Sequence, residues 1–139
     1  MNGPVANVSA PGGLAPSSEA PWDGMLAGLF AAIDAKNTEQ FLEHLSESPR
    51  FRFGSAPAVE GRAAVREAVQ AFFDSIAGLE HSLSASASVG TTLFTEGDVT
   101  YTRHDGSTIT LPFADVFELR DGRIADYKIY MDIGPLYAG

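Results

Sequence analysis

The stretch from Val99 to Asp132 constrains the fold of this 139-residue chain more than any other. It contains three runs in which apolar and polar residues alternate, and Asp-Gly pairs at 105–106 and 121–122 separate the runs. Alternation with a period of two is typical of a strand with one buried face, and an Asp-Gly pair between two such runs indicates a hairpin. The stretch therefore predicts three consecutive antiparallel strands.

The length of the loop at the first turn decides which side chains share a face, because a slip of one residue moves every side chain to the other face. A two-residue loop would place Arg103 opposite Thr108. A three-residue loop that ends in a left-handed Gly106 would instead place Tyr101 opposite Ile109. We prefer the three-residue loop because it gathers the apolar residues of both strands on one face.

The second turn leaves two registers open. A three-residue loop would place Tyr127 opposite Asp115, whereas a two-residue loop would place Lys128 there. With the three-residue loop, Ile129 and Met131 lie on the same face as Asp115. We prefer this register for the same reason as at the first turn.

On this register the opposite face of the sheet carries Lys128, Tyr130 and Asp132. Those residues include large side chains, and no helix remains in the sequence to cover them. We expect this outer face to form a homodimer interface.

Apolar residues with helical spacing come before these strands. Helices with one apolar face are expected over residues 22–33, between Asn37 and Pro49, and over residues 62–78. Alternating runs at 50–53 and 81–89 predict further strands. Helices followed by antiparallel strands predict an α+β fold in which the N-terminal helices pack on one face of a curved antiparallel sheet. The hollow between them is a common place for a small-molecule site.

The beginning of the chain differs in composition from the rest. Residues 1–20 are rich in Gly, Pro, Ser and Ala and are expected to form a disordered or loosely packed tail. Residues 21–139 are expected to form a single domain. The first basic residue is Lys36, so the basic start of a signal peptide is missing and a cytoplasmic location is expected.

The composition also limits the partners and the chemistry. A formal net charge of -9 disfavours binding to nucleic acid and docking on anionic membranes. The chain has no cysteine, which excludes thiolate catalysis, and its three histidines lack the spacing of metal ligands. No apolar run approaches the roughly 20 residues that span a bilayer. We therefore expect no metal, no cofactor, no nucleic acid and no membrane partner.

Asp115 is the carboxylate that interrupts the apolar face of the central strand, between Phe113 and Phe117. A carboxylate in apolar surroundings costs several kcal/mol unless it is paired or neutralised. Its pKa is then expected to be raised, which suits a general acid or a hydrogen-bond donor to a developing oxyanion. The structural alternative is a carboxylate that is bonded to Tyr127 or paired with Lys128.

Arginine and tyrosine side chains on the same face are further candidates. Arg103 ends a strand there, where a guanidinium can orient a substrate and stabilise charge or can be simply exposed beside the turn. Tyr101 and Tyr127 can donate hydrogen bonds to a substrate oxygen. The expected catalytic residues are Asp115, Arg103 and Tyr127, and the expected substrate-binding residues are Tyr101, Phe30, Phe53, Phe72, Phe113, Ile129 and Met131.

Structural roles are favoured for the other polar residues considered. His81 begins an alternating strand and can be a general acid or base, but a hydrogen-bonded histidine at a sheet edge is the preferred interpretation. His104 is expected to be exposed in its turn, and Asp105 fits turn chemistry by itself. Asp132 can be a base at the cavity mouth, but a role in capping the final turn or in the outer face is preferred.

Three pieces of sequence carry a resemblance to a known family: LAGLFAAIDAKNTEQFLEHL, GRAAVREAVQAFF and LPFADVFELRDGRIADYKIYMD. In this order they resemble the nuclear transport factor 2-like (NTF2-like) superfamily, in particular its SnoaL-like, polyketide-cyclase-like members, over residues 22–136. The resemblance implies a cystatin-like α+β barrel with a cone-like cavity. The superfamily includes isomerases, cyclases, dehydratases, epoxide hydrolases and proteins that only bind or dimerise.

The first residue-by-residue comparison is with the ketosteroid isomerases of this superfamily. Asp115, in ADVFEL, matches the aspartic acid that donates a hydrogen bond in their oxyanion hole. Their tyrosine on the first helix corresponds to Leu29, and their carboxylate base corresponds roughly to Arg52 or Phe53. The resemblance thus carries over the acid and not the base.

Limonene-epoxide-hydrolase-like enzymes give the second comparison. Arg103-His104-Asp105 looks like their Arg-x-Asp pair. Their second aspartate corresponds to Ile129, and their water-holding Tyr and Asn correspond to Phe51 and Phe53. The resemblance again carries over part of the catalytic set.

Taken together, these features favour a cofactor-independent enzyme that isomerises, cyclises or dehydrates a hydrophobic small molecule by proton transfer. Two alternatives stay open. One is a non-catalytic dimeric module that binds a small molecule in the same cavity, and the other is an epoxide hydrolase-like activity with a non-standard site.

Overall fold

A computed structural model describes residues 22–138 of the chain, so the tail expected over residues 1–20 lies outside the described residues. The helices are α1 (Asp23–Asp34), α2 (Thr38–Glu43), α3 (Arg62–Asp74) and α4 (Gly134–Tyr137). The strands are β1 (Leu45–Phe53), β2 (Val59–Glu60), β3 (Gly78–Val89), β4 (Thr92–Thr102), β5 (Thr108–Arg120) and β6 (Arg123–Tyr130). None of the helices in this part of the chain is both long and apolar enough to cross a bilayer.

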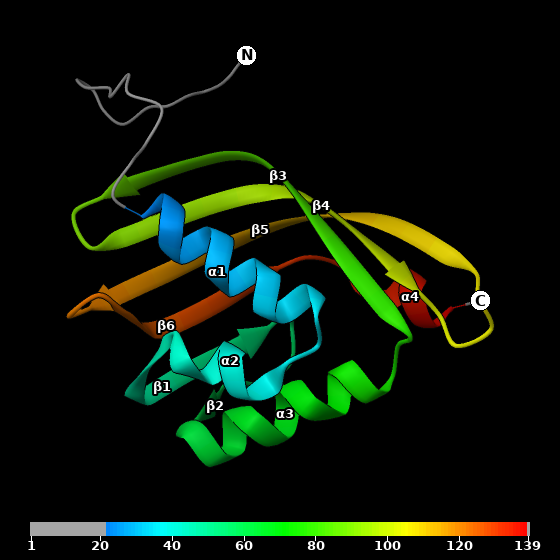
Figure 1. The fold of residues 1–139 in the computed structure, drawn as a ribbon, viewed down its shortest axis with the longest axis horizontal. Helices are drawn as coiled ribbons and strands as arrows, with labels where there is room; N and C mark the ends of the chain where they lie inside the picture. The colour runs from blue at the N-terminus through cyan, green and yellow to red at the C-terminus, as the bar shows by residue number, and fades with distance from the viewer. Residues whose placement is uncertain (1–21, 139) are drawn as a thin grey trace.

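The strands form one curved sheet in the order β2-β1-β6-β5-β4-β3, and Figure 1 shows α1, α2 and α3 on its concave side. Helix α1 packs against β3, and α3 packs against β1 and β2. The α+β prediction is confirmed, with two refinements. The sheet does not close, since β2 and β3 form its edges. In addition, β1 pairs with β6 in parallel, although every strand pair was expected to be antiparallel.

The first predicted turn is confirmed. Tyr101 lies opposite Ile109, and the backbone N–H of Arg103 donates to the carbonyl of Ser107 over 2.8 Å. Gly106 has a φ of +91°, a conformation that glycine adopts without the steric cost of a Cβ. The turn therefore has the three-residue loop with a glycine bulge, and the apolar residues of β4 and β5 share a face.

The second turn differs from the preferred prediction. Its loop has two residues, Asp121 and Gly122, both with positive φ, as a type I′ hairpin requires. The register then shifts between Glu118 and Leu119, where β6 carries one extra residue. Because of this bulge, Asp115 lies opposite Ile129, and neither Tyr127 nor Lys128 takes that place. Tyr127 still points to the concave face, and it lies opposite Phe117.

The second and third helices are shorter than the spacing of apolar residues predicted. Helix α2 ends at Glu43, and the residues up to Pro49 belong to β1. A proline is tolerated there because the pairing of β1 with β6 is irregular between Leu45 and Arg50, so no ladder hydrogen bond is lost. Helix α3 ends at Asp74 and not at residue 78.

The core lies between the helices and the concave face of the sheet. Aliphatic residues of α1 and α3 meet aromatic residues of the sheet there, and the fully buried members include Leu29, Val65, Ile76, Phe117 and Tyr127. This core fixes the helices over the sheet, and it leaves one hollow that is described next.

Candidate active site

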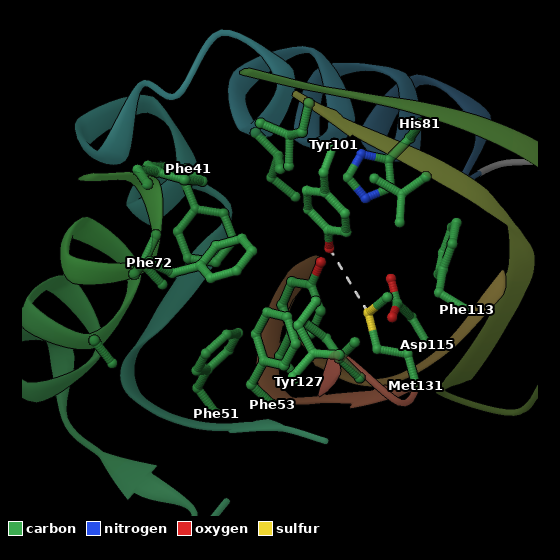
Figure 2. Close-up of a pocket in the computed structure, with 18 of the residues that line it drawn as sticks. Phe41, Phe51, Phe53, Phe72, His81, Tyr101, Phe113, Asp115, Tyr127 and Met131 are labelled. Carbon is green, nitrogen blue, oxygen red and sulfur yellow. Dashed lines mark hydrogen bonds between the residues drawn. The ribbon is translucent and has the colours of Figure 1, made fainter. Parts of the chain in front are cut away.

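A cavity of about 280 Å³ lies between the concave face of the sheet and helix α3. This volume is at the small end of the ~300–1,000 Å³ range of small-molecule sites and suits a molecule of one or two rings. Figure 2 shows the aromatic side chains that surround it. Six phenylalanines line the cavity, namely Phe41, Phe51, Phe53, Phe72, Phe73 and Phe113.

Asp115 projects from β5 into this apolar cavity, as Figure 2 shows, and it is only 2% exposed. Its Oδ1 atom is buried without a hydrogen-bond partner among the described residues. Lys128 directly precedes Ile129 on β6, so its side chain lies on the other face of the sheet. Neither structural alternative, a bond to Tyr127 or a pair with Lys128, is present within residues 22–138.

Burial raises the pKa of Asp115 well above the ordinary value of an aspartate, because the ionised form loses its hydration. No lysine or arginine in the described part of the chain lines the cavity to offset this effect. The protonated carboxyl is a hydrogen-bond donor. The site thus offers an acid in an apolar cavity.

His81 also lines the cavity, and Asp34 holds its ring. The Nδ1 atom of His81 lies 2.7 Å from Oδ1 of Asp34, and the backbone N–H of His81 donates to Oδ2 of the same carboxylate over 3.0 Å. The ring also contacts the rings of Phe30 and Phe113, with centroids 4.7 and 5.1 Å away. The imidazole is therefore fixed by the carboxylate on one edge and by aromatic rings on its faces.

The Asp34 contact also determines which nitrogen of His81 is free. In the neutral imidazole only one ring nitrogen carries a proton, so a ring that donates from Nδ1–H to Asp34 presents a lone pair at Nε2. No residue within 22–138 is hydrogen-bonded to Nε2. Histidine is the side chain that exchanges protons near neutral pH, so the arrangement suits a general base. His81 is thus hydrogen-bonded, as the preferred interpretation of the sequence has it, and it also faces the cavity.

Two tyrosines add hydroxyl groups to the cavity wall. The hydroxyl of Tyr101 donates to Sδ of Met131 over 3.7 Å, as the dashed line in Figure 2 marks. Burial raises the pKa of both Tyr101 and Tyr127, so both hydroxyls stay protonated and can donate. The predicted wall residues Tyr101, Phe53, Phe72, Phe113, Ile129 and Met131 all line the cavity.

The structure places Arg103 and Phe30 elsewhere. The Arg103 guanidinium donates through Nε to the carbonyl of Leu136 over 2.8 Å and through Nη2 to that of Pro135 over 3.1 Å. It is not part of the cavity wall, because its strand end turns toward α4. Phe30 is a core residue that packs behind His81 and Phe113 and does not line the cavity.

The remaining candidates are turn residues. Oδ1 of Asp105 accepts from the backbone N–H and the hydroxyl of Ser107, and Oδ1 of Asp132 accepts from the N–H of Gly134 over 3.0 Å. His104 contacts the carbonyl of Asp74 over 2.9 Å. The Arg-x-Asp pair of the epoxide hydrolase comparison therefore lies outside the cavity wall.

The sequence interpretation missed Asp34 and placed His81 second to its structural role. Asp34 lies four residues after Phe30, so both lie on the core-facing side of α1. An acid on an apolar helix face is the same signal that identified Asp115 on its strand. The sequence could not show that this acid meets His81, which is 47 residues away. Within residues 22–138, no three acidic or histidine side chains come together as a metal site.

Comparison with known proteins gives the fold a family context. The family model of the SnoaL-like domain matches residues 26–127. The chain is similar to a putative polyketide cyclase from Xanthomonas campestris pv. campestris, with 23% identity, a TM-score of 0.74, and coverage of 83% of this chain and 93% of that one. No curated protein matches the sequence.

Two further solved structures that resemble this chain contain small molecules. TerC, co-crystallised with polyporic acid, has 17% identity and a TM-score of 0.74, with coverage of 85% of this chain and 96% of that one. A hypothetical protein with a ketosteroid isomerase-like fold from Catenulispora acidiphila, in complex with trimethylamine, has 12% identity and a TM-score of 0.71, with coverage of 78% and 85%. At these identities the similarity establishes the fold.

Proposed function

Because this chain belongs to the SnoaL-like domain family, we propose that its cavity is the active site of an enzyme that moves a proton on a small carbonyl compound. One observation carries the proposal. A single apolar cavity holds a histidine that a carboxylate orients, His81 with Asp34, and an unpartnered buried acid, Asp115. Groups whose environments push them toward opposite roles are typical of acid–base sites.

The proposed chemistry begins with His81. Its Nε2 takes a proton from the carbon next to the carbonyl, and the electron pair of that C–H bond moves toward the carbonyl oxygen to give an enolate. Asp34 stabilises the imidazolium that forms, and it keeps the ring in place. Asp115 donates a hydrogen bond to the oxygen as negative charge develops on it. Tyr101 or Tyr127 can add a second donor.

The fate of the enolate distinguishes the possible reactions. Return of the proton from His81 to another carbon gives an isomer. Attack of the enolate carbon on a second carbonyl of the same molecule gives a ring, and loss of a neighbouring hydroxyl as water gives a dehydrated product. All three share the first proton transfer, which the geometry supports and which therefore defines the proposed function.

The wall of the cavity supports an uncharged, largely apolar substrate. The phenylalanines provide apolar contact area, and no described lysine or arginine is present there to hold a carboxylate or phosphate. A hydrogen bond to a developing oxyanion is stronger in an apolar site than in solution. The small organic molecules in two similar structures, polyporic acid and trimethylamine, also favour a small organic ligand here.

The test measures the shared first step without knowledge of the natural substrate. One- and two-ring ketones (cyclohexanone, 1-indanone and 2-tetralone) are incubated with the protein in D2O, and NMR follows the exchange of the protons next to the carbonyl. We expect the wild-type protein to accelerate exchange for at least one ketone. His81→Gln and Asp115→Leu should each reduce the acceleration about a hundredfold or more. His104→Gln, which changes a histidine outside the cavity wall, is the matched control.

Two outcomes would reject this proposal. Exchange no faster than in buffer, with a ketone shown by NMR to bind in the cavity, would favour the non-catalytic binding module. Acceleration that survives both His81→Gln and Asp115→Leu would show that other groups carry it.

We also propose a homodimer through the outer face of the sheet. Tyr130 on β6 is 53% exposed and Phe94 on β4 is 39% exposed, and the sheet register places both on this face. Val116 on β5 lies directly opposite Phe94 and adds apolar surface. Exposed aromatic and aliphatic side chains on neighbouring strands are typical of an interface between copies of a chain.

A further inference from the structure

The entrance to the cavity is indicated by the exposure of its wall residues. Two of them are exposed, Ala56 in the loop after β1 and Tyr137 in α4. The other wall residues are buried or, like Phe72 and Ile133, half-buried. The cavity therefore opens between the loop after β1 and the end of the described chain.

The C-terminal segment, residues 131–137, forms one side of this entrance. It contributes Met131, Ile133 and Tyr137 to the cavity wall. It is not a strand of the sheet, since β6 ends at Tyr130. Its buried Leu136 and its half-buried Met131 and Ile133 pack against the core. Its other attachments are hydrogen bonds that involve side chains.

Arg103 makes two of those hydrogen bonds. Its Nε and Nη2 atoms bind the carbonyls of Leu136 and Pro135, as described above, and its Nη1 donates to the hydroxyl of Ser107 over 3.0 Å. Ser107 is held in turn by Asp105 in the three-residue loop. A charged guanidinium that binds carbonyls in a fixed fork is a strong and directional tie. Two other ties are seen among the described residues: the contact between the hydroxyls of Tyr137 and Ser75, at 2.9 Å, and the hydrogen bond from the Tyr101 hydroxyl to Sδ of Met131, at 3.7 Å.

We propose that the C-terminal segment is a movable lid over the entrance to the cavity and that Arg103 is the positioning residue that holds this lid closed. Release of these few ties would move α4 away from the entrance without breaking any strand pair of the sheet. A ligand would then enter and leave past Ile133 and Tyr137. This inference rests on the cavity being the ligand site, as proposed above, but not on the chemistry that follows binding.

The absence of cysteine from the chain makes a direct test possible, because an introduced thiol is unique. Val99 lines the cavity and is 1% exposed, so Val99→Cys reports access to the cavity. Ile124 is 0% exposed and does not belong to the cavity wall, so Ile124→Cys reports opening of the whole fold. The rate of modification by methyl methanethiosulfonate, a small uncharged reagent, is followed by mass spectrometry.

Arg103→Ala is introduced into both reporters. We expect the thiol at position 99 to react at least tenfold faster and the thiol at position 124 to react at an unchanged rate. Arg103→Lys keeps the charge but loses the fork, so an intermediate rate is expected at position 99. Arg120→Ala is the matched control, because Arg120 also ends a strand at an Asp-Gly turn but is exposed, and it should change neither rate.

An unchanged rate at position 99 would overturn the proposal. An equal increase at both positions would also overturn it, because Arg103 would then stabilise the whole fold. If Val99→Cys does not fold, Ile129→Cys provides a second reporter on the cavity wall. The measurement uses no substrate, so a negative result would not contradict the proposed proton transfer. In the same way, a failure to accelerate ketone exchange would not contradict the proposed opening of the C-terminal segment.

Discussion

Two aspartates in this protein have the same side chain and opposite surroundings. Asp34 accepts two hydrogen bonds from His81, whereas Asp115 has an oxygen atom with no partner in the described structure. The first carboxylate is suited to orient a base. The second is suited to stay protonated and to act as an acid. Environment and not residue type assigns the two roles.

The first prediction concerns the stability cost of Asp115. Its pKa is raised in the fold, so between the unfolded value, about 4, and the raised folded value the native state binds more protons than the unfolded state. Stability therefore falls as pH rises through this window. Asn does not titrate. The free energy of unfolding of Asp115→Asn, relative to that of the wild type, should therefore rise by roughly 1 kcal/mol for each unit by which pH increases within this window. Urea unfolding at pH 4.5, 6 and 7.5 measures the difference.

Asp105→Asn is the contrasting control for that experiment. Hydrogen bonds from Ser107 lower the pKa of Asp105, so its contribution to stability is present above the unfolded pKa and is lost as pH falls through the folded one. Relative to the wild type, this variant should be less stable at neutral pH and should converge with it in acid. A difference between Asp115→Asn and the wild type that does not change with pH would contradict a raised pKa for Asp115.

At the residue scale, the position of a side chain could be predicted where one strand or helix contains the whole signal. The burial of Asp115 could be predicted because it interrupts an apolar period within β5. Arg103 was misplaced because its partners are backbone carbonyls of Pro135 and Leu136, which no side-chain pattern encodes. The pair of His81 and Asp34 joins two elements that only the packing of α1 on β3 brings together.

At the scale of elements, the bulge in β6 decides what Asp115 faces. The turn before it takes the two-residue form that Asp-Gly favours, which alone would have put Lys128 opposite Asp115. The extra residue reverses this outcome and keeps Lys128 outside. Two adjacent buried residues, Ile124 and Ala125, mark the bulge in the sequence, since strict alternation would expose one of them. The preferred face was thus correct, but the loop length and the facing residue were wrong.

A second prediction concerns the bend in β3 and β4. A Cβ atom at Gly97 would collide with the carbonyl oxygen of Ser82 and would lie 2.9 Å from the Cα of Leu83, where the register of β3 shifts. Backbone atoms cannot move aside as a flexible side chain can. Gly97→Ala should therefore lower the free energy of unfolding by roughly 2–3 kcal/mol, as overpacking does. Thermal and urea unfolding measure this loss.

Gly78→Ala is the matched control for the bend. Gly78 lies in β3, and a Cβ there would meet no atom within 4 Å. This variant should unfold within about 0.5 kcal/mol of the wild type. If Gly97→Ala unfolds like Gly78→Ala, the bend is not set by the close approach of β3 and β4.

At the scale of the molecule, the two faces of the curved sheet have different roles. Its concave face, under α1 and α3, holds the core and the cavity. Its outer face exposes aromatic side chains on β4 and β6. The α+β class and the covering helices could be predicted from periodicity. The parallel pairing of β1 with β6 could not, because short strands far apart in sequence carry no signal for their partner.

The third prediction concerns the outer face. In the proposed dimer Tyr130 is buried against a second copy, so Tyr130→Glu would place a charge in that interface. Sedimentation velocity should show a dimer for the wild type and a monomer for this variant. Ala71→Glu, at an exposed site on α3, is the control and should remain dimeric. A wild-type monomer at micromolar concentration, or a Tyr130→Glu dimer, would contradict the proposal.

The pairing of β1 with β6 has a consequence for the order in which the protein can fold during its synthesis. Translation delivers β1 early, but its neighbour in the middle of the sheet is the last strand to emerge. Strands β3, β4 and β5 can pair as successive hairpins while synthesis continues, because each partner follows directly. Strand β1 pairs early only with the two-residue strand β2, so its other edge must wait for almost the whole chain. The cavity therefore comes into being in a single late event, when β6 docks between β1 and β5.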